Sequence, residues 1–234
     1  MDEAIIDLNN LCFRWKKSGN ILLDIPKFQL KQNEHVFLQG PSGCGKSTLL
    51  SLVGGILISE SGSLKVLGQE IWDLSRSGRD AFRVDHIGFI FQLFNLLPYL
   101  SIEENVMLPL SFSSIRSNRA GKTKLDRLNE AQRLIKSLGL EEEQVEKRPV
   151  IELSVGQQQR VAAARALIGD PELIIADEPT SSLDTELRHS FLDLLFEECK
   201  KSGSTLLFVS HDSTLSDNFK TKASMDELNI IKIK

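Results

Sequence analysis

The residues most able to do chemistry form a short glycine-rich segment that follows an apolar run. The segment has the pattern G-x-x-x-x-G-K-[ST] and consists of Gly40, Pro41, Ser42, Gly43, Cys44, Gly45, Lys46, Ser47 and Thr48. Glycines let consecutive backbone N–H groups turn inward around a polyphosphate, and a helix that begins there directs its positive end to the same place. In such a loop Lys46 reaches the terminal phosphates and the Ser47 hydroxyl binds Mg²⁺. The segment therefore predicts a site for a nucleotide polyphosphate.

Two adjacent carboxylates end a second apolar run. Leu173–Ala176 is wholly apolar, and Asp177 and Glu178 follow it. A carboxylate at the end of a buried strand can hold Mg²⁺, directly or through water, and its neighbour can accept a proton from an attacking water. Many strands end in acidic residues, so this pair is informative only beside the phosphate loop. Together the two motifs predict nucleotide hydrolysis.

The pattern of apolar residues predicts which elements carry these motifs. Alternating or continuous apolar runs predict strands at Ile5–Leu8, Leu11–Trp15, Phe28–Leu30, Val36–Leu38, Ser63–Val66, Ile87–Phe91, Leu173–Ala176 and Thr205–Ser210. A helix is expected to follow Gly45, and residues from about 101 to 170 have helical character, with the polar stretch Ser111–Thr123 interpreted as a surface loop. The order predicts an α/β chain with a helical insertion, in which the last two strands belong to a parallel sheet covered on both faces.

Composition excludes several other classes of protein. The 234 residues are 41% hydrophobic and 26% charged with a net charge of -4, which argues against a nucleic-acid binder with a broad basic face. The acidic N-terminus does not resemble a signal peptide, and no apolar run is long enough to cross a bilayer. The three cysteines have no metal-ligand spacing and indicate a reducing compartment.

Four further features complete an ordered set of motifs. Glu152–Arg160 reads ELSVGQQQR, Ser181–Asp184 follows the two carboxylates, and Gln92 and His211 each follow a predicted strand. In this order and spacing the chain resembles the nucleotide-binding subunit of ABC transporters over nearly its whole length. The resemblance implies an α/β P-loop NTPase fold: a parallel-sheet core, an N-terminal antiparallel β subdomain and an inserted α-helical subdomain. It implies one ATP-binding domain over residues 1–234, with the core near 1–92 and 161–234 and the helical subdomain near 93–160.

The resemblance also implies ligands and residue roles. ATP and Mg²⁺ would bind, and the residues expected to act in hydrolysis are the general base Glu178, the γ-phosphate contact His211, the phosphate-binding Lys46 and Gln92, which senses the membrane partner. The Mg²⁺ ligands would be Ser47, Gln92 and Asp177. Besides the phosphate loop, nucleotide contacts are expected from Trp15, stacked on adenine, and, across a head-to-tail homodimer, from Ser154, Gly156, Gln157 and Asp184.

One residue departs from the family pattern. Val155 stands where the signature Leu-Ser-Gly-Gly-Gln has its first glycine. A β-branched residue disfavours a positive φ angle, so we expect an ordinary backbone conformation at Val155. Because Ser154, Gly156 and Gln157 match the signature, activity is expected to persist, with an altered affinity of the dimer as a possible consequence.

The segment Phe91–Pro98, followed by Glu103–Val106, is most similar to the lipoprotein-releasing and macrolide-export group. This similarity implies a membrane permease as partner, no nucleic acid, and a peripheral location on the cytoplasmic face of the inner or plasma membrane. Four loop residues in and just after Phe91–Pro98 could form the groove for a coupling helix of the permease or could pack in the core: Phe94, Leu96, Leu97 and Tyr99. The alternative class is an ABC ATPase without a transporter that acts on a soluble assembly.

Overall fold

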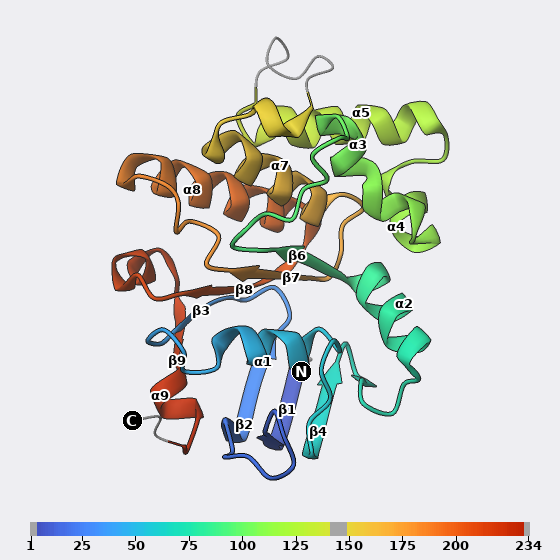
Figure 1. The fold of residues 1–234 in the computed structure, drawn as a ribbon. Coiled ribbons are helices and arrows are strands. Elements are labelled where there is room, and N and C mark those ends of the chain that lie inside the picture. Colours follow the sequence, from blue (N-terminus) through green and yellow to red (C-terminus); the bar gives the residue numbers. More distant parts are fainter. Residues whose placement is uncertain (1–3, 141–148, 232–234) are drawn as a thin grey trace. The chain divides into compact units, whose positions relative to one another are not determined.

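The computed structural model describes residues 4–140 and 149–231, apart from the side chains of residues 185 and 186. These residues form two compact units. The first unit comes from Met1–Arg83 and Thr205–Lys234, and the second from Val84–Ser204. Both units combine strands with helices (Figure 1).

An antiparallel sheet forms one part of the first unit. Its strand order is β2-β1-β4-β5, with β1 at Ala4–Phe13, β2 at Leu23–Lys31, β4 at Ser61–Val66 and β5 at Gln69–Glu70. The sequence predicts two strands where the structure has the single strand β1. The reason is a register shift between Asn9 and Cys12, where Asn10 adopts a left-handed conformation with φ 51°. A methyl group on Gly62 would lie 2.5 Å from the carbonyl oxygen of Asn10, so this close approach requires glycine.

Parallel strands form the other part of the first unit. The central strand β3 (His35–Gln39) pairs in parallel with β8 (Thr205–Ser210) and with β9 (Thr221–Ser224). Leu206–Val209 is completely buried, which agrees with the expectation of a strand covered on both faces. The helices that lie wholly within this unit are α1 at Lys46–Val53, the 3₁₀ helix η3 at Ser213–Asn218 and α9 at Met225–Leu228, and the first eight residues of α2, Arg76–Arg83, also belong to it.

The second unit is built on two parallel strands, β6 (Ile87–Ile90) and β7 (Leu173–Asp177). The helix α2, at Arg76–His86, leads into β6. The remaining helices are α3 at Ile102–Met107, η1 at Leu108–Ser111, α4 at Ser114–Ala120, α5 at Lys124–Ser137, η2 at Val150–Glu152, α7 at Val155–Leu167 and α8 at Thr185–Ser202. A methyl group on Gly88 would lie 2.2 Å from the carbonyl oxygen of Ala166, so β6 packs directly on the backbone of α7.

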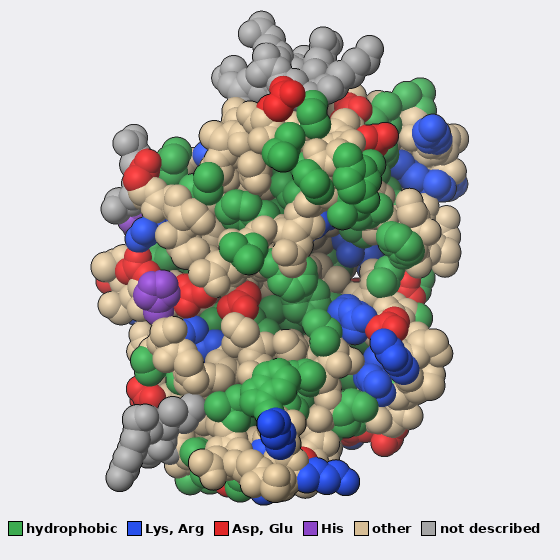
Figure 2. Space-filling model, in the orientation of Figure 1, with side chains coloured by type: hydrophobic (Ala, Val, Ile, Leu, Met, Phe, Trp, Pro, Cys, Tyr) green, Lys and Arg blue, Asp and Glu red, His purple; other side chains and the backbone are tan. Residues whose placement is uncertain are grey.

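The surface of the second unit carries apolar side chains. On the face shown in Figure 2, hydrophobic side chains reach the surface over α3 and α5. Leu93 and Tyr99, which precede α3, are 82% and 75% exposed. Across the described residues, no helix combines the length and the apolar composition needed to cross a bilayer.

The interpretation of Ser111–Thr123 as a loop is wrong. Most of this stretch is the helix α4, which begins at the N-cap Ser113, whose hydroxyl accepts a hydrogen bond from the backbone N–H of Arg116. Polar composition suggested an exposed loop, yet the Arg116 side chain is 2% exposed and donates hydrogen bonds to backbone carbonyls beyond α7. A buried guanidinium with backbone partners leaves no signal in the pattern of apolar residues.

Ion pairs at Glu172, just before β7, give the second unit a pH-dependent stability. The carboxylate lies 3.0 Å from Nδ1 of His86 and 2.6 Å from Nη2 of Arg119. Burial alone would raise the pKa of Glu172, but these hydrogen bonds outweigh it and hold the pKa at about 2, below the ordinary 4.5. A depressed pKa in the folded state stabilises the protein above the ordinary pKa, and this contribution is lost as the pH falls from about 4.5 towards 2.

We expect Glu172→Gln to lower the free energy of unfolding by roughly 1 kcal/mol at pH 7, because the pair is partly screened by solvent. The difference from the wild type should shrink as the pH is lowered from 5 to 2. Urea unfolding followed by far-ultraviolet circular dichroism at several pH values measures this difference. A loss that is independent of pH would contradict the assignment to an ion pair.

Candidate functional site

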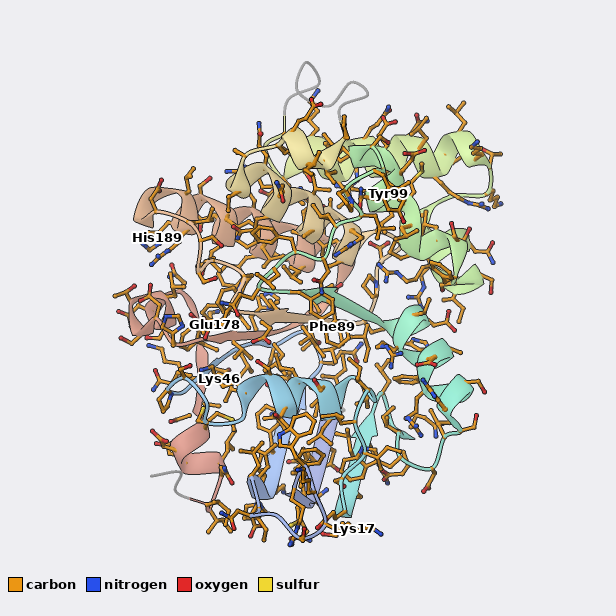
Figure 3. The ribbon with its side chains drawn as sticks, viewed as in Figure 1. Lys17, Lys46, Phe89, Tyr99, Glu178 and His189 are labelled. Carbon is orange, nitrogen blue, oxygen red and sulfur yellow. The ribbon has the colours of Figure 1, made fainter. Side chains whose placement is uncertain are left out.

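The glycine-rich loop of the first unit follows β3 and leads into α1. Gly43 and Gly45 have φ angles of 82° and 98°, a left-handed region that glycine adopts at little cost. Lys46, labelled in Figure 3, is 7% exposed, and its ammonium donates to the carbonyl oxygens of Gly40 at 2.6 Å and Pro41 at 3.0 Å. The loop thus wraps around the lysine that the sequence assigns to phosphate binding.

Two glycines of the loop are required by packing. A methyl group on Gly40 would lie 2.7 Å from Sγ of Cys44, and one on Gly45 would lie 2.6 Å from a methyl carbon of Leu23. Gly45 is the N-cap of α1 and, having no side chain, makes no side-chain capping hydrogen bond. Backbone N–H groups at such an end attract anions, because the helix dipole adds to their positive partial charge.

Two further predicted residues belong to the first unit. Gln39 in β3 pairs with Ser210 in β8, so His211 and the glycine-rich loop leave neighbouring parallel strands at the same edge. Trp15 follows β1, is 65% exposed and packs edge-on against Phe13 with ring centroids 5.3 Å apart. One face of the indole is therefore available for stacking.

The second unit brings another group of predicted residues to one edge. Ile90 in β6 pairs with Ala176 in β7, so Gln92, Asp177 and Glu178 all lie where these two strands end. Glu178, labelled in Figure 3, is 8% exposed and has a left-handed backbone with φ 49°. A buried carboxylate on a strained backbone indicates a position fixed by function rather than by local preference.

The segment Ser154–Gln157 forms the N-terminus of α7. The Ser154 hydroxyl accepts from the backbone N–H of Gln157 at 3.3 Å, and the Gln157 side chain accepts from the backbone N–H of Ser154 at 2.9 Å, which together make a capping box. Val155 is the first helical residue and does not have a positive φ, as expected. Its side chain is 47% exposed. The change from glycine is therefore compatible with an intact helix start.

Gly156 lies beside the segment that contains Asp184. A methyl group on Gly156 would meet Leu183 at 3.5 Å and Leu187 at 3.9 Å, which are ordinary contact distances. Packing within the described residues therefore does not require glycine at this position. Asp184 caps α8 by accepting from the backbone N–H of Leu187 at 2.9 Å. The structure thus places the start of α7 next to the start of α8.

The predicted residues fall into two groups, one in each unit. The first unit carries Trp15, the glycine-rich loop and His211; the second carries Gln92, Ser154, Gly156, Gln157, Asp177, Glu178 and Asp184. The three residues proposed for Mg²⁺ offer a hydroxyl, an amide and a carboxylate oxygen, which are the donors that this hard cation prefers. The donor chemistry therefore fits Mg²⁺.

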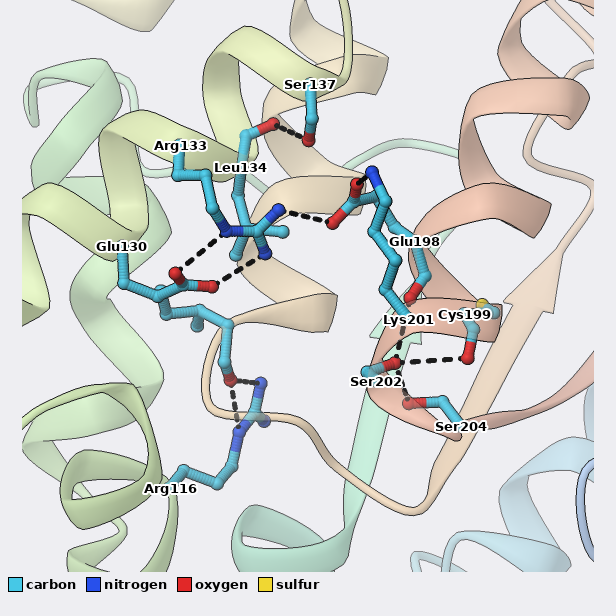
Figure 4. Close-up of polar contacts among 11 residues, drawn as sticks. Arg116, Glu130, Arg133, Leu134, Ser137, Glu198, Cys199, Lys201, Ser202 and Ser204 are labelled. Carbon is cyan, nitrogen blue, oxygen red and sulfur yellow. Dashed lines mark hydrogen bonds and ion pairs between the residues drawn. The ribbon is translucent and has the colours of Figure 1, made fainter.

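Sequence reasoning missed two buried polar side chains, Asn105 and Arg116, and the half-buried Arg165, which bind backbone groups in this part of the second unit. Asn105 is completely buried, and Arg116 is 2% exposed and donates to the carbonyl oxygen of Ile168 at 2.8 Å (Figure 4). Arg165 of α7 donates to carbonyl oxygens of the segment after Gln92. The only available signal was a polar residue within a helical segment, and that signal does not distinguish a buried side chain from an exposed one.

Comparison with known proteins identifies the family that this chain resembles. Residues 23–181 match the family described as "ABC transporter". The chain is 37% identical over 196 residues to the ABC transporter ATP-binding protein YtrE of Bacillus subtilis, covering 84% of this chain and 80% of that protein. It is also 37% identical over 212 residues to the macrolide export ATP-binding/permease protein MacB of Mannheimia succiniciproducens, covering 91% of this chain but 31% of that larger protein.

A solved structure shows the same fold. The ATP-binding cassette MJ0796, in a dimeric post-hydrolysis state bound to ADP and Pi, superposes with a TM-score of 0.83 at 34% identity, covering 94% of this chain and 93% of that one. The predicted α/β fold class is confirmed, as is the resemblance on which it rested.

Proposed function

The chain belongs to the ABC transporter ATP-binding family, and from that premise we propose that it hydrolyses MgATP as a head-to-tail homodimer and drives a membrane permease of the export or lipoprotein-release type. The observation that carries the proposal is the loop around Lys46. A buried ammonium that donates to backbone carbonyls can exchange these neutral acceptors for phosphate oxygens, with which it bonds more strongly.

The remaining residues of the first unit would hold the rest of the nucleotide. The exposed face of Trp15 is suited to stack on adenine, and the N–H groups at the start of α1 are suited to the phosphates. Ser47, the second residue of α1, would place its exposed hydroxyl at Mg²⁺. His211 would contact the γ-phosphate from the end of β8, on the strand next to the loop.

The second unit would supply the hydrolytic groups. Asp177 and Gln92 would complete the oxygen ligands of Mg²⁺, which, when bound, neutralises charge on the phosphates. Glu178 would take a proton from the attacking water. Two parallel strands hold these three residues at one edge, which fixes their positions relative to one another.

A second copy of the chain would complete each site. Ser154 caps α7, and packing among the described residues does not require glycine at position 156, so the backbone N–H groups at the start of α7 and Gly156 could approach a nucleotide held by another copy. Asp184 lies on the same surface, beside Gly156, and would contact the partner copy. The dimeric state of MJ0796 supports this arrangement.

The exposed apolar side chains before α3 would receive the permease. Of the four residues considered for a coupling-helix groove, Phe94 is buried and packs in the core, Leu96 and Leu97 are half-buried, and Tyr99 is exposed. Leu93, which was not in that set, is more exposed than any of them. Docking there would hold the chain at the cytoplasmic face of the membrane. The likeness to MacB, whose name includes a permease, supports the export or release group.

The proposal is tested by purifying the tagged chain from native membranes in mild detergent. We expect a permease with few spans and a large extracytoplasmic domain to remain bound in stoichiometric amount, and the complex to hydrolyse MgATP. A Lys46→Ala chain prepared in the same way should retain the permease and lose hydrolysis. Recovery of soluble partners alone, or of none, would instead favour an ABC ATPase that acts on a soluble assembly.

A further inference from the structure

The segment between Gln92 and α3 has an unusual backbone. Phe94 and Asn95 both adopt left-handed conformations, with φ angles of 58° and 50°. This region is unfavourable for a bulky L-residue such as phenylalanine, whereas asparagine tolerates it better. The conformation therefore persists only because other groups hold it.

Arg165 of α7 holds this strained turn. Its guanidinium donates from Nη1 to the carbonyl oxygen of Asn95 at 2.7 Å and from Nη2 to that of Phe94 at 2.5 Å. The fork of a guanidinium can donate to two acceptors at once, and a bond from a charged donor is stronger than one between neutral groups. The Phe94 side chain is buried, so the turn is fixed on its apolar side as well.

Asn105 of α3 fixes the other end of the segment. Its side-chain amide donates to the carbonyl oxygens of Leu97 at 3.1 Å and Ser101 at 3.1 Å, and its carbonyl accepts from the backbone N–H of Leu97 at 2.8 Å. The exposed Leu93 and Tyr99 flank the stretch between these two anchors. A partner that displaces these exposed side chains would therefore also displace a backbone that is hydrogen-bonded to Arg165 of α7 and to Asn105 of α3.

We propose that Arg165 is a positioning residue that ties the Gln92 segment to α7, so that a displacement at Leu93–Tyr99 is transmitted to the helix that begins at Ser154. The inference deepens the proposed function, because it names the link between the surface assigned to the permease and the helix assigned to the partner copy's nucleotide. Arg165 lies three helical turns along α7 from its N-cap, and β6 packs against the same helix. The link is thus short and rigid.

The test uses the full chain with Arg165→Gln, which removes the two charge-assisted bonds, and Arg165→Lys, which retains a charged donor. The matched control is Arg160→Gln. Arg160 lies on the same helix and also donates to a backbone carbonyl, but that carbonyl belongs to Leu138 at the end of α5. Amide hydrogen exchange of residues 93–97 is measured together with kcat and KM for MgATP.

In Arg165→Gln we expect exchange of residues 93–97 to rise about tenfold or more. We also expect kcat to fall about tenfold with KM changed by less than about twofold, because the site keeps its nucleotide contacts. Arg165→Lys should recover part of both, and Arg160→Gln should leave exchange of residues 93–97 unchanged. If Arg165 only stabilised α7, Arg165→Gln and Arg160→Gln would change the exchange of residues 93–97 and kcat to the same extent.

Three results would overturn the inference: exchange in Arg165→Gln equal to that of the wild type, an equal rise in Arg160→Gln, or a rise in exchange with kcat unchanged. A wild-type chain that hydrolyses no ATP would refute the proposed function. In that case hydrogen exchange alone would still decide whether Arg165 holds the segment.

Discussion

In Glu178→Gln we expect hydrolysis of MgATP to fall roughly 100-fold or more, while the ATP-bound chain becomes a stable dimer. The amide has the shape of the carboxylate but cannot accept a proton from water. Glu178 is 8% exposed and directly follows β7. If two copies close around two nucleotides, a variant that binds but does not hydrolyse stays closed.

Gel filtration with light scattering in saturating MgATP measures the dimer, and phosphate release measures kcat. The same variant in ADP should remain a monomer. Glu152→Gln changes an exposed glutamate shortly before Ser154 and is the matched control, expected to hydrolyse and to dissociate as the wild type does. A monomer in saturating MgATP, or hydrolysis within about tenfold of the wild type, would refute the role of Glu178.

The sequence was sufficient to predict the elements that carry these residues. The run Thr205–Ser210 is a strand with the bounds predicted from its apolar residues, and Ile87–Phe91 and Leu173–Ala176 each agree within one residue. Strands of this kind are continuous in hydrophobicity because both faces are covered. Because parallel strands end at a common edge, the pairing of β6 with β7 brings Gln92 and Glu178 to the same edge, but the sequence alone does not predict this pairing.

Side-chain contacts with the backbone could not be predicted in the same way. The bulge at Asn10 depends on a partner strand some 50 residues away, and the turn at Phe94 depends on Arg165. Local propensity argues against the left-handed conformation at Phe94, and it permits that conformation at Asn10 without predicting it. The sequence indicates which residues are polar, but only the fold determines which backbone N–H and carbonyl groups lack a backbone partner and can bind those side chains.

Arg116 illustrates this most clearly, and its loss should cost more stability than any other single change considered above. The guanidinium donates from Nε to the carbonyl oxygen of Ile168 and from Nη2 to that of Ala166, each at 2.8 Å. These carbonyls belong to the end of α7, where a helix leaves acceptors without partners in its own backbone. Burial lowers the pKa of Arg116 to about 10, so it remains charged at neutral pH.

We therefore expect Arg116→Ala to lower the free energy of unfolding by about 3–5 kcal/mol, since it removes charged hydrogen bonds and leaves buried carbonyls unsatisfied. Arg116→Lys keeps a charge and some donors and should lose about half as much. Arg119→Ala is the control on the same helix: Arg119 is partly exposed, and its pair with Glu172 should contribute less than about 1 kcal/mol. Urea unfolding measured by circular dichroism compares the three. Equal losses in Arg116→Ala and Arg119→Ala would mean that the buried contacts of Arg116 with α7 do not stabilise the second unit. Arg116 would then contribute no more to stability than an exposed residue, as the polar composition of Ser111–Thr123 suggests.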